Sequence, residues 1–392
     1  MTSPRRAPRA SYVALSRSGE LEQRARALDA MLSDCTVCPH ECRVDRRVNL
    51  GNCATGADAA LASWCPHHGE EPVISGRLGS GTVFLANCNL RCAFCQNHDI
   101  SQRSRDFRDA TITDARLASI FLELQDRGCH NINWVSPSHQ VPQLVRGLVL
   151  AAGRGLAIPI VYNTNAYDSV ETLRLLDGVV DIYMPDLKFA DPETGCRLSG
   201  IPDYPRHARA ALAEMHRQIG DDWNVGPDGA LQRGILIRML VLPENLAGIE
   251  TSLEWIAREL SPRTAISLLA QYRPAHRALR SNEFPELKRG ITTDEWKRAA
   301  DALRRHMTGD RHHQQWGGRC ADHCRCSLIP SPAAVAAHRL PPLFSAAAAA
   351  FGIGIGIESA TATVTVTATA TATARVTEPR RSTCRWCRPR NR

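Results

Sequence analysis

The fold is decided by the stretch GSGTVFLANCNLRCAFC, residues 79–95. Within it, residues 82–86 form an apolar run typical of a buried strand, and Cys88, Cys92 and Cys95 follow on the next loop. Three thiolates at x3 and x2 spacing can bind three irons of a [4Fe–4S] cubane, which a fourth cysteine normally completes. No further cysteine follows before Cys129. The sequence therefore predicts a cluster in which one iron stays open to another ligand.

A zinc knuckle is the alternative for these cysteines, but it usually needs a fourth ligand and favours paired Cys-x2-Cys units. The position directly after a strand, and the aromatic Phe94 before the last cysteine, favour the cluster. S-adenosylmethionine (SAM) can chelate the open iron through its amino and carboxylate groups. An electron from the cluster then cleaves SAM to a 5′-deoxyadenosyl radical, which abstracts hydrogen.

Outward from this stretch, apolar strand-like runs alternate with helical patterns as far as about residue 307. The runs are residues 82–86, 131–135, 158–162, 179–184, 235–242 and 265–269. Six βα units in series predict an α/β fold with a parallel sheet wrapped by helices. Curled into an open barrel, a partial (β/α)6 barrel, such a sheet has its active site at the C-terminal strand ends.

Three segments are expected along the chain: an N-terminal helix and cysteine-rich extension over 1–78, the barrel over 79–308, and a low-complexity, disordered tail over 309–392. Residues 20–33 read as the N-terminal helix. The tail holds a five-alanine run and a long Thr-Ala and Thr-Val alternation, from which no packed unit can be built.

The extension contains a second cysteine group, Cys35-x2-Cys38-Pro-x2-Cys42-x10-Cys53. Four thiolates within nineteen residues are enough for a structural zinc or an auxiliary iron–sulfur cluster. We therefore expect a second metal or cluster here, with its identity open between zinc, iron–sulfur and no permanent metal.

The cysteine motif after the first strand is the signature of the radical SAM superfamily, and residues 79–97 resemble the homologues of pyruvate formate-lyase activating enzyme. This resemblance runs from about Leu21 to Met307. The segments HGEEP, residues 68–72, and NINWVSPSH, residues 131–139, are typical of its branch of activating-enzyme-like iron–sulfur proteins. It implies a radical SAM enzyme, an oxidoreductase that binds a [4Fe–4S] cluster and SAM.

The resemblance also implies SAM-site residues, with Phe94 among them. Where the activating enzymes have Gly-Gly-Glu for the SAM amino group, this chain reads SPSH, so Ser136, Ser138, His139 or backbone carbonyls must make those contacts. The remaining implied positions lie at later strand ends and are Asn163, Asn165, Asp186, Lys188 and Arg238. In the family the lysine pairs with the SAM carboxylate and the aspartate helps to coordinate a monovalent cation.

Physical chemistry supports part of this assignment without the family. Lys188 and Arg238 stand at the ends of buried strands and need anionic partners, because an unpaired buried cation is costly. The SAM carboxylate is one such partner, and an internal salt bridge to Asp186 is the alternative. Asn163 and Asn165 could equally cap strand ends or order loop backbone.

Two carboxylates, Glu70 and Glu71, stand just before the first strand. They could form a paired-carboxylate site or solvated acids in a turn before Pro72.

Charge and composition limit the classes of partner that the protein can have. The net charge is +8, but the segment from residue 310 on carries +7 of it, so the barrel shows no basic surface for nucleic acid. No apolar stretch is long enough for a membrane span. We expect a cytoplasmic enzyme with reduced flavodoxin or ferredoxin as electron donor and a protein or other substrate. The alternative function is a zinc-stabilised, cysteine-rich module that binds nucleic acid or protein without catalysis.

Overall fold

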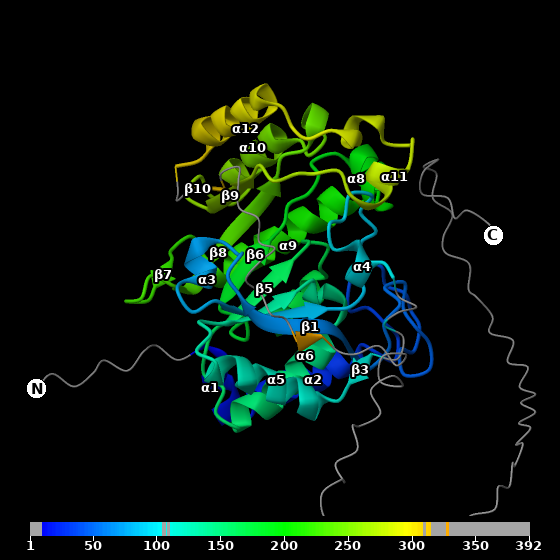
Figure 1. The fold of residues 1–392 in the computed structure, drawn as a ribbon. Coiled ribbons are helices and arrows are strands. Elements are labelled where there is room, and N and C mark those ends of the chain that lie inside the picture. Colours follow the sequence, from blue (N-terminus) through cyan, green and yellow to red (C-terminus); the bar gives the residue numbers. More distant parts are fainter. Residues whose placement is uncertain (1–9, 104–106, 108–109, 309–310, 315–326, 329–392) are drawn as a thin grey trace, which may run out of the picture.

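The structure is a computed structural model, and it describes residues 10–103, 107, 110–308, 311–314 and 327–328. Its centre is one sheet with the strand order β10-β9-β8-β6-β5-β4-β2-β1-β11 (Figure 1). The strands are β1 (Ala59–His67), β2 (Ser80–Leu85), β3 (Thr111–Ile112), β4 (Ile132–Val135), β5 (Ile160–Thr164), β6 (Ile182–Pro185), β7 (Asn224–Val225), β8 (Leu231–Leu240), β9 (Ala265–Leu269), β10 (Arg311–Gln314) and β11 (Ser327–Leu328).

Six of these strands, β2, β4, β5, β6, β8 and β9, run parallel and follow one another across the sheet in chain order. Each overlaps one of the six apolar runs, so the predicted α/β fold, a partial parallel barrel, is confirmed. Because their C-terminal ends meet at one edge, residues that follow different strands come together there.

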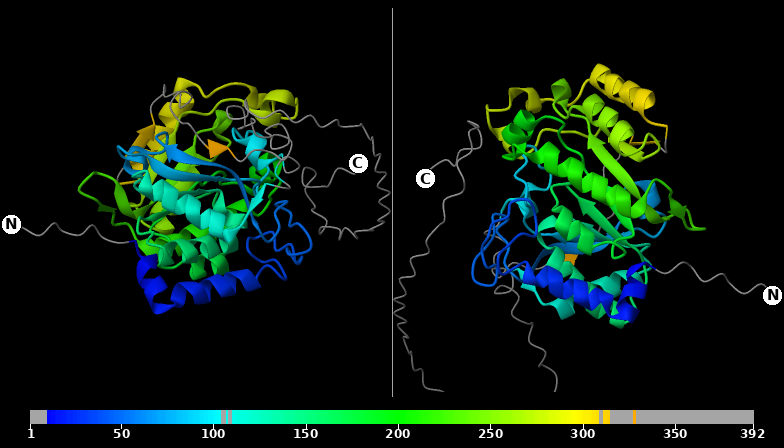
Figure 2. Two further views of the ribbon diagram at one scale, coloured as in Figure 1. Left: turned by 60° about the horizontal axis from the view of Figure 1, so that its bottom comes forward. Right: turned by 180° about the vertical axis from the view of Figure 1, so that it is seen from behind.

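Helices cover the outside of the curved sheet (Figures 1 and 2). They are α1 (Tyr12–Ser18), α2 (Glu20–Ala30), α3 (Pro72–Ser75), α4 (His98–Ser101), α5 (Asp114–Asp126), α6 (Val141–Gly153), α7 (Val170–Leu175), α8 (Pro192–Ser199), α9 (Tyr204–Ile219), α10 (Ile249–Glu259), α11 (His276–Arg280) and α12 (Thr293–His306), with short 3-10 turns at Pro137–His139, Pro243–Asn245 and Pro285–Lys288. Below the sheet in Figure 1, α1, α2, α5 and α6 form one packed layer, whereas α10 packs on α12 at the top.

The alternation of side chains along the strands separates two environments. Large aromatic side chains, Trp134, Tyr162 and Tyr183, lie in the main core. The opposite face of the same strands carries Asn133 and Asn163, which lie one residue to either side of these aromatics along the chain. The inner face of the barrel is therefore partly polar.

Strand β1 was not among the strands expected from the sequence. It pairs antiparallel with β2, so that His67 lies opposite Ser80 at the start of β2. The chain then turns into α3, whose Ile74 packs in a small apolar cluster against Val161, Ile182 and Met184. This end of the barrel, opposite the strand ends that carry the cysteines, is filled by α3.

Most of the predicted tail lies outside the described residues. The two pieces that are described pair with the sheet: β10 lies parallel to β9, and β11 lies antiparallel to β1. No helix in the described part of the chain is long and apolar enough to cross a membrane.

Candidate functional site

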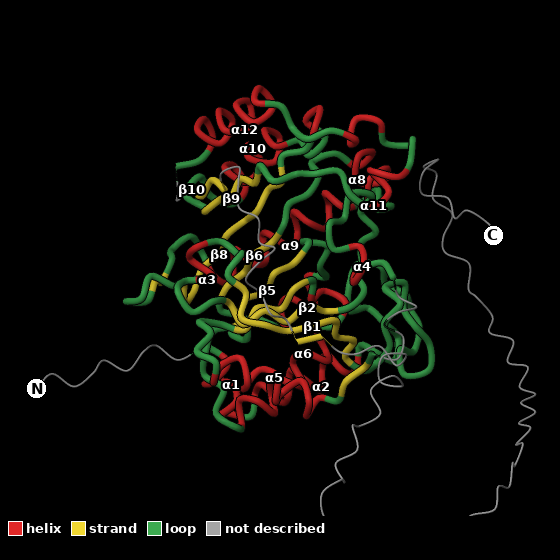
Figure 3. The backbone as a smooth tube through the Cα atoms, viewed as in Figure 1, coloured by secondary structure: helices red, strands yellow, loops and turns green. Residues whose placement is uncertain are grey.

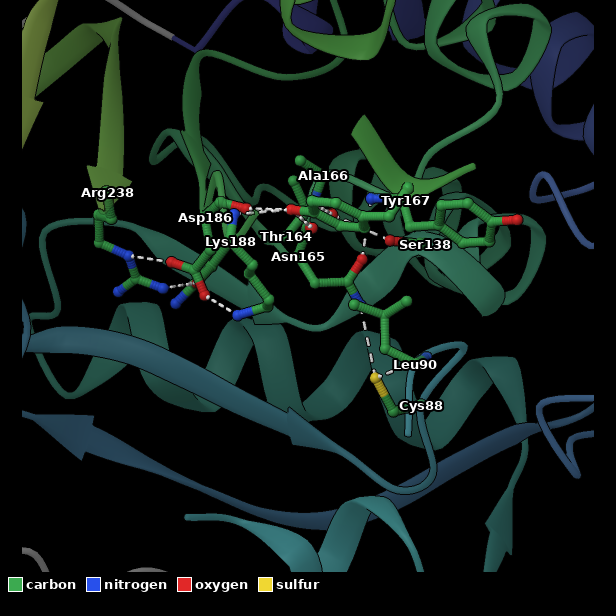
Figure 4. Close-up of polar contacts among 12 residues, drawn as sticks. Cys88, Leu90, Ser138, Thr164, Asn165, Ala166, Tyr167, Asp186, Lys188 and Arg238 are labelled. Carbon is green, nitrogen blue, oxygen red and sulfur yellow. Dashed lines mark hydrogen bonds and ion pairs between the residues drawn. The ribbon is translucent and has the colours of Figure 1, made fainter. Parts of the chain in front are cut away.

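The loop after β2 carries the predicted cluster ligands. Cys92 is buried, with 8% of its surface exposed, whereas Cys88 and Cys95 are partly exposed. The sulfur of Cys88 accepts hydrogen bonds from the backbone N–H of Leu90 and from Nδ2 of Asn165, both at 3.4 Å. Figure 4 shows the Asn165 amide pointing at this sulfur. Donors aimed at a sulfur stabilise its thiolate, which is the form that binds metal.

Burial raises the pKa of Cys88 to about 11 and that of Cys92 to about 12. Lys188 opposes the shift at both thiols. Without a metal these groups hold their protons, so binding iron must release them. Among the described residues, no three His, Cys, Asp or Glu side chains are arranged to hold one metal ion. A cubane differs from one ion, because it binds each thiolate through a separate iron atom.

A charged network lies at the same edge of the barrel. Asp186 follows β6 and its carboxylate accepts from Lys188 Nζ at 2.8 Å and from Arg238 Nε at 2.7 Å (Figure 4). Arg238 Nη2 donates to Oδ1 of Asn163 at 2.6 Å. Although burial acts to raise it, the pKa of Asp186 is held below its ordinary value by the two cations. Burial alone would lower the pKa of Lys188, but Asp186 raises it, so the ammonium stays charged.

The internal salt bridge considered from the sequence is therefore present. It does not occupy Lys188 fully, because an ammonium has three donors and the carboxylate takes one of them.

The acids before α3 reach the same network from the filled end of the barrel. Glu70 Oε2 lies 3.3 Å and Glu71 Oε2 lies 3.7 Å from Arg238 Nη1. Glu71 is only 1% exposed, and burial raises its pKa. The idea of solvated acids in a turn is thus wrong for Glu71, because the turn into α3 directs it into the barrel. The paired carboxylates before Pro72 were the signal that could have identified it.

Tyr204, at the start of α9, was missed by the sequence reasoning. Its buried hydroxyl accepts from the backbone N–H of Lys188 at 2.9 Å and lies 2.9 Å from the carbonyls of Asn165 and Asp186. The phenol thus links the ends of β5 and β6. No sequence signal marks this role, because Tyr204 fits the apolar face of an ordinary amphipathic helix.

In the segment after β4, residues 136–139, one side chain is partly exposed to solvent and the others are buried. Ser136 is partly exposed and adopts a left-handed conformation with φ 57°. Ser138 is buried and its hydroxyl lies 2.9 Å from Thr164 Oγ1, while buried His139 donates from Nε2 to the carbonyl of Ala86 at 3.1 Å. Of the three predicted contacts to the SAM amino group, this arrangement favours Ser136, because Ser138 and His139 are turned inward.

His139 instead supports the start of the cysteine loop, and its burial makes stability depend on pH. Desolvation lowers its pKa from 6.5 to about 3. The imidazole therefore binds a proton more readily in the unfolded chain than in the folded one. The contribution of neutral His139 to the free energy of unfolding is thus fully present above about pH 6.5 and decreases as the pH falls below it. We expect His139 to remove about 2 kcal/mol of unfolding free energy between pH 8 and pH 5, measured by urea unfolding. His139→Gln, which keeps a donor for Ala86, should flatten that part of the pH profile; an unchanged profile would refute the assignment.

Phe94, predicted from its place before the last cysteine, lies buried among aromatic rings. It packs edge-on against Phe189 and Tyr272, each with ring centroids 6.1 Å away. Its ring anchors the cysteine loop between the ends of β6 and β9.

The residues present fit a cluster with SAM. Three thiols, an ammonium with unused donors and a partly exposed Ser136 share the C-terminal edge. Inside the barrel, both polar atoms of the Asn133 side chain are buried without a hydrogen-bond partner among the described residues. Buried polar groups are normally paired, so these atoms indicate a place for a polar ligand or water.

Comparisons with known proteins agree with this geometry. Residues 82–256 match a family model described as the radical SAM superfamily. The chain is also 31% identical over 279 residues to an uncharacterized protein of Methanocaldococcus jannaschii, and the match covers 69% of this chain and 74% of that protein.

Proposed function

Because the chain belongs to the radical SAM superfamily, and is therefore an iron–sulfur enzyme that binds SAM, we propose that Cys88, Cys92 and Cys95 hold its [4Fe–4S] cluster. When bound, the cluster supplies the electron that cleaves SAM to a 5′-deoxyadenosyl radical for hydrogen abstraction. One observation carries the proposal: Asn165 at the end of β5 donates to the Cys88 sulfur, and the Tyr204 hydroxyl joins Asn165 to Asp186 and Lys188, so the cysteine loop and Lys188 lie at one strand edge.

In this proposal, side chains at the strand edge bind SAM and orient the cluster ligands. Lys188 Nζ, held by Asp186, binds the SAM carboxylate, and Ser136 with nearby carbonyls takes the amino group. Asn165 stabilises the Cys88 thiolate, and its Oδ1 is fixed by the backbone N–H of Tyr167 at 2.9 Å. Arg238 holds Asp186 and Asn163 in place, so we assign these two residues to positioning, without a cation site.

For the substrate we propose hydrogen abstraction of the activating-enzyme type, in which the radical is passed to a protein or peptide. The resemblance of residues 21–307 supports this, whereas the inward-facing Ser138 and His139 mean that the details of the activating enzymes do not transfer. We further propose a cytoplasmic setting with reduced flavodoxin or ferredoxin as donor, since the electron must come from a low-potential carrier.

Cleavage of SAM is the direct test. Anaerobically reconstituted protein, given dithionite and SAM, is expected to release 5′-deoxyadenosine and methionine, measured by liquid chromatography. Protein that binds only zinc and releases neither product would refute the proposal and favour the binding module. A glycyl radical signal in candidate partner proteins, measured by electron paramagnetic resonance, tests the substrate class separately.

A further inference from the structure

Residues 31–58 form a segment without a helix or strand, seen as the blue loop at the right of Figure 1 and as green loop at the same place in Figure 3. It nevertheless buries Cys35, Cys38 and Cys53, while its apolar Val48 and Leu50 are 77% and 49% exposed. Leu32 and Val37 tie the segment to the core, but it has no regular secondary structure, and bound metal is a common further source of stability for such a segment.

The four cysteines of this segment lie near one another, but among the described residues no three of them are arranged around one ion, so metal binding must draw their sulfurs closer together. The side chains of Cys35 and Cys42 interact with each other. A Cβ atom placed on Gly51 would lie 3.4 Å from the sulfur of Cys53 and 3.5 Å from that of Cys42. The backbone N–H of Asn52 donates to the Cys42 sulfur at 3.2 Å. Backbone donors to sulfur are a recurring feature of metal–thiolate centres.

Arg46 lies beside these cysteines and is only 2% exposed. Its guanidinium donates to three backbone carbonyls, those of Thr55 at 3.0 Å, Gly56 at 2.8 Å and His139 at 2.7 Å. Among the described residues, no carboxylate forms an ion pair with it. A buried cation without an acid is costly, so its charge must be balanced by something else. The cysteines beside it would supply that charge as thiolates on a metal, since a Cβ atom on Gly51 would lie 3.9 Å from Arg46 Cδ as well as close to the sulfurs of Cys42 and Cys53.

We propose that Cys35, Cys38, Cys42 and Cys53 bind a second metal as a tetrathiolate centre whose negative charge is partly balanced by Arg46. Zinc and an iron–sulfur cluster share this ligand chemistry, since both take four thiolates and both leave a net charge of about −2. On binding, the four thiols release their protons to solvent and their sulfurs form bonds to the metal.

The centre is built against the loop that carries the first cluster. His40, between Cys38 and Cys42, lies with Nε2 2.7 Å from the carbonyl of Asn89, and Arg91 donates to the carbonyl of Asn52 at 3.2 Å. Arg46 in turn holds the carbonyl of His139, whose ring supports Ala86. This expectation rests on the proposed function: because the two centres lie against each other, loss of the second metal should also slow the cleavage of SAM.

Metal analysis of three versions of the full chain tests the centre. Wild type, reconstituted anaerobically with iron, sulfide and zinc, is expected to hold either about eight irons or about four irons and one zinc per chain. A variant with Cys88, Cys92 and Cys95 all replaced by Ala should keep about four irons or one zinc. A Cys38→Ser, Cys53→Ser variant should retain only the SAM-responsive cluster of about four irons.

The outcomes separate the two proposals. Wild type with four irons, no zinc and full SAM cleavage would overturn the second centre and leave the proposed function intact. A chain that keeps metal only at the N-terminal cysteines and never cleaves SAM would do the reverse. Mössbauer spectra of the triple Ala variant tell an iron–sulfur cluster from a protein that holds zinc alone.

Arg46 is a positioning residue in this proposal, and its charge can be tested. Arg46→Met is expected to lose the second metal to a chelator roughly tenfold faster than wild type, as is usual when a partner outside the metal ligands is removed. Arg46→Lys, which keeps the charge, should restore part of the difference. Equal metal retention in Arg46→Met and wild type would overturn the role of Arg46; if Arg46→Met fails to fold, the cysteine variants still decide the centre itself.

Discussion

Cys92→Ala is expected to abolish both the first cluster and the cleavage of SAM. Cys92 is the most buried of the three cysteines. A cubane already short of one cysteine ligand would be left with two, so the cluster should not assemble. We expect 5′-deoxyadenosine release to fall to background, and iron at this site to fall to near zero, measured by chromatography and metal analysis.

Cys129→Ala is the matched control for that result. Cys129 is also a buried, free cysteine, but it follows α5 at the start of β4, at the opposite ends of the strands. Its removal should leave the iron content and the SAM cleavage rate unchanged. Full activity in Cys92→Ala, or equal loss in both variants, would contradict the assignment of the site.

Asp186→Asn is expected to destabilise the protein by about 2–4 kcal/mol, because it leaves Lys188 and Arg238 as neighbouring cations without their shared acid. The value lies below that of a fully buried pair, since a quarter of the Asp186 side chain is exposed. Glu70 and Glu71 still balance Arg238 in part. Urea unfolding of the metal-free protein under reducing conditions measures the change.

Lys188→Met separates stability from ligand binding at the same place. Asp186 keeps its pairing with Arg238 in this variant, so the free energy of unfolding should stay within about 1 kcal/mol of wild type. Affinity of the reconstituted enzyme for SAM should fall about 10- to 100-fold, the usual effect of losing a hydrogen bond to a charged group. A Lys188→Met variant that binds SAM normally but unfolds like Asp186→Asn would show that the lysine is purely structural.

The barrel was predictable because strands buried on both faces are continuous apolar runs separated by helical patterns. Strand β1 was not, since its sequence AALASWCPH mixes small, polar and proline residues without a clear period. The cysteine loop and Asp186 with Lys188 could be located because strand ends meet at one edge. The sequence does not show which way a side chain points. Only the folded structure shows that the His139 ring faces the carbonyl of Ala86 and that the Glu71 carboxylate reaches Arg238.

The filled end of the barrel has a kinetic consequence. Ile74 of α3 packs against Val161 of β5 and Ile182 of β6, so apolar side chains cover this part of the end opposite the cysteines. Substrate, methionine and 5′-deoxyadenosine would then share one entrance. Added 5′-deoxyadenosine should accordingly slow the cleavage of fresh SAM, measured by the release of methionine.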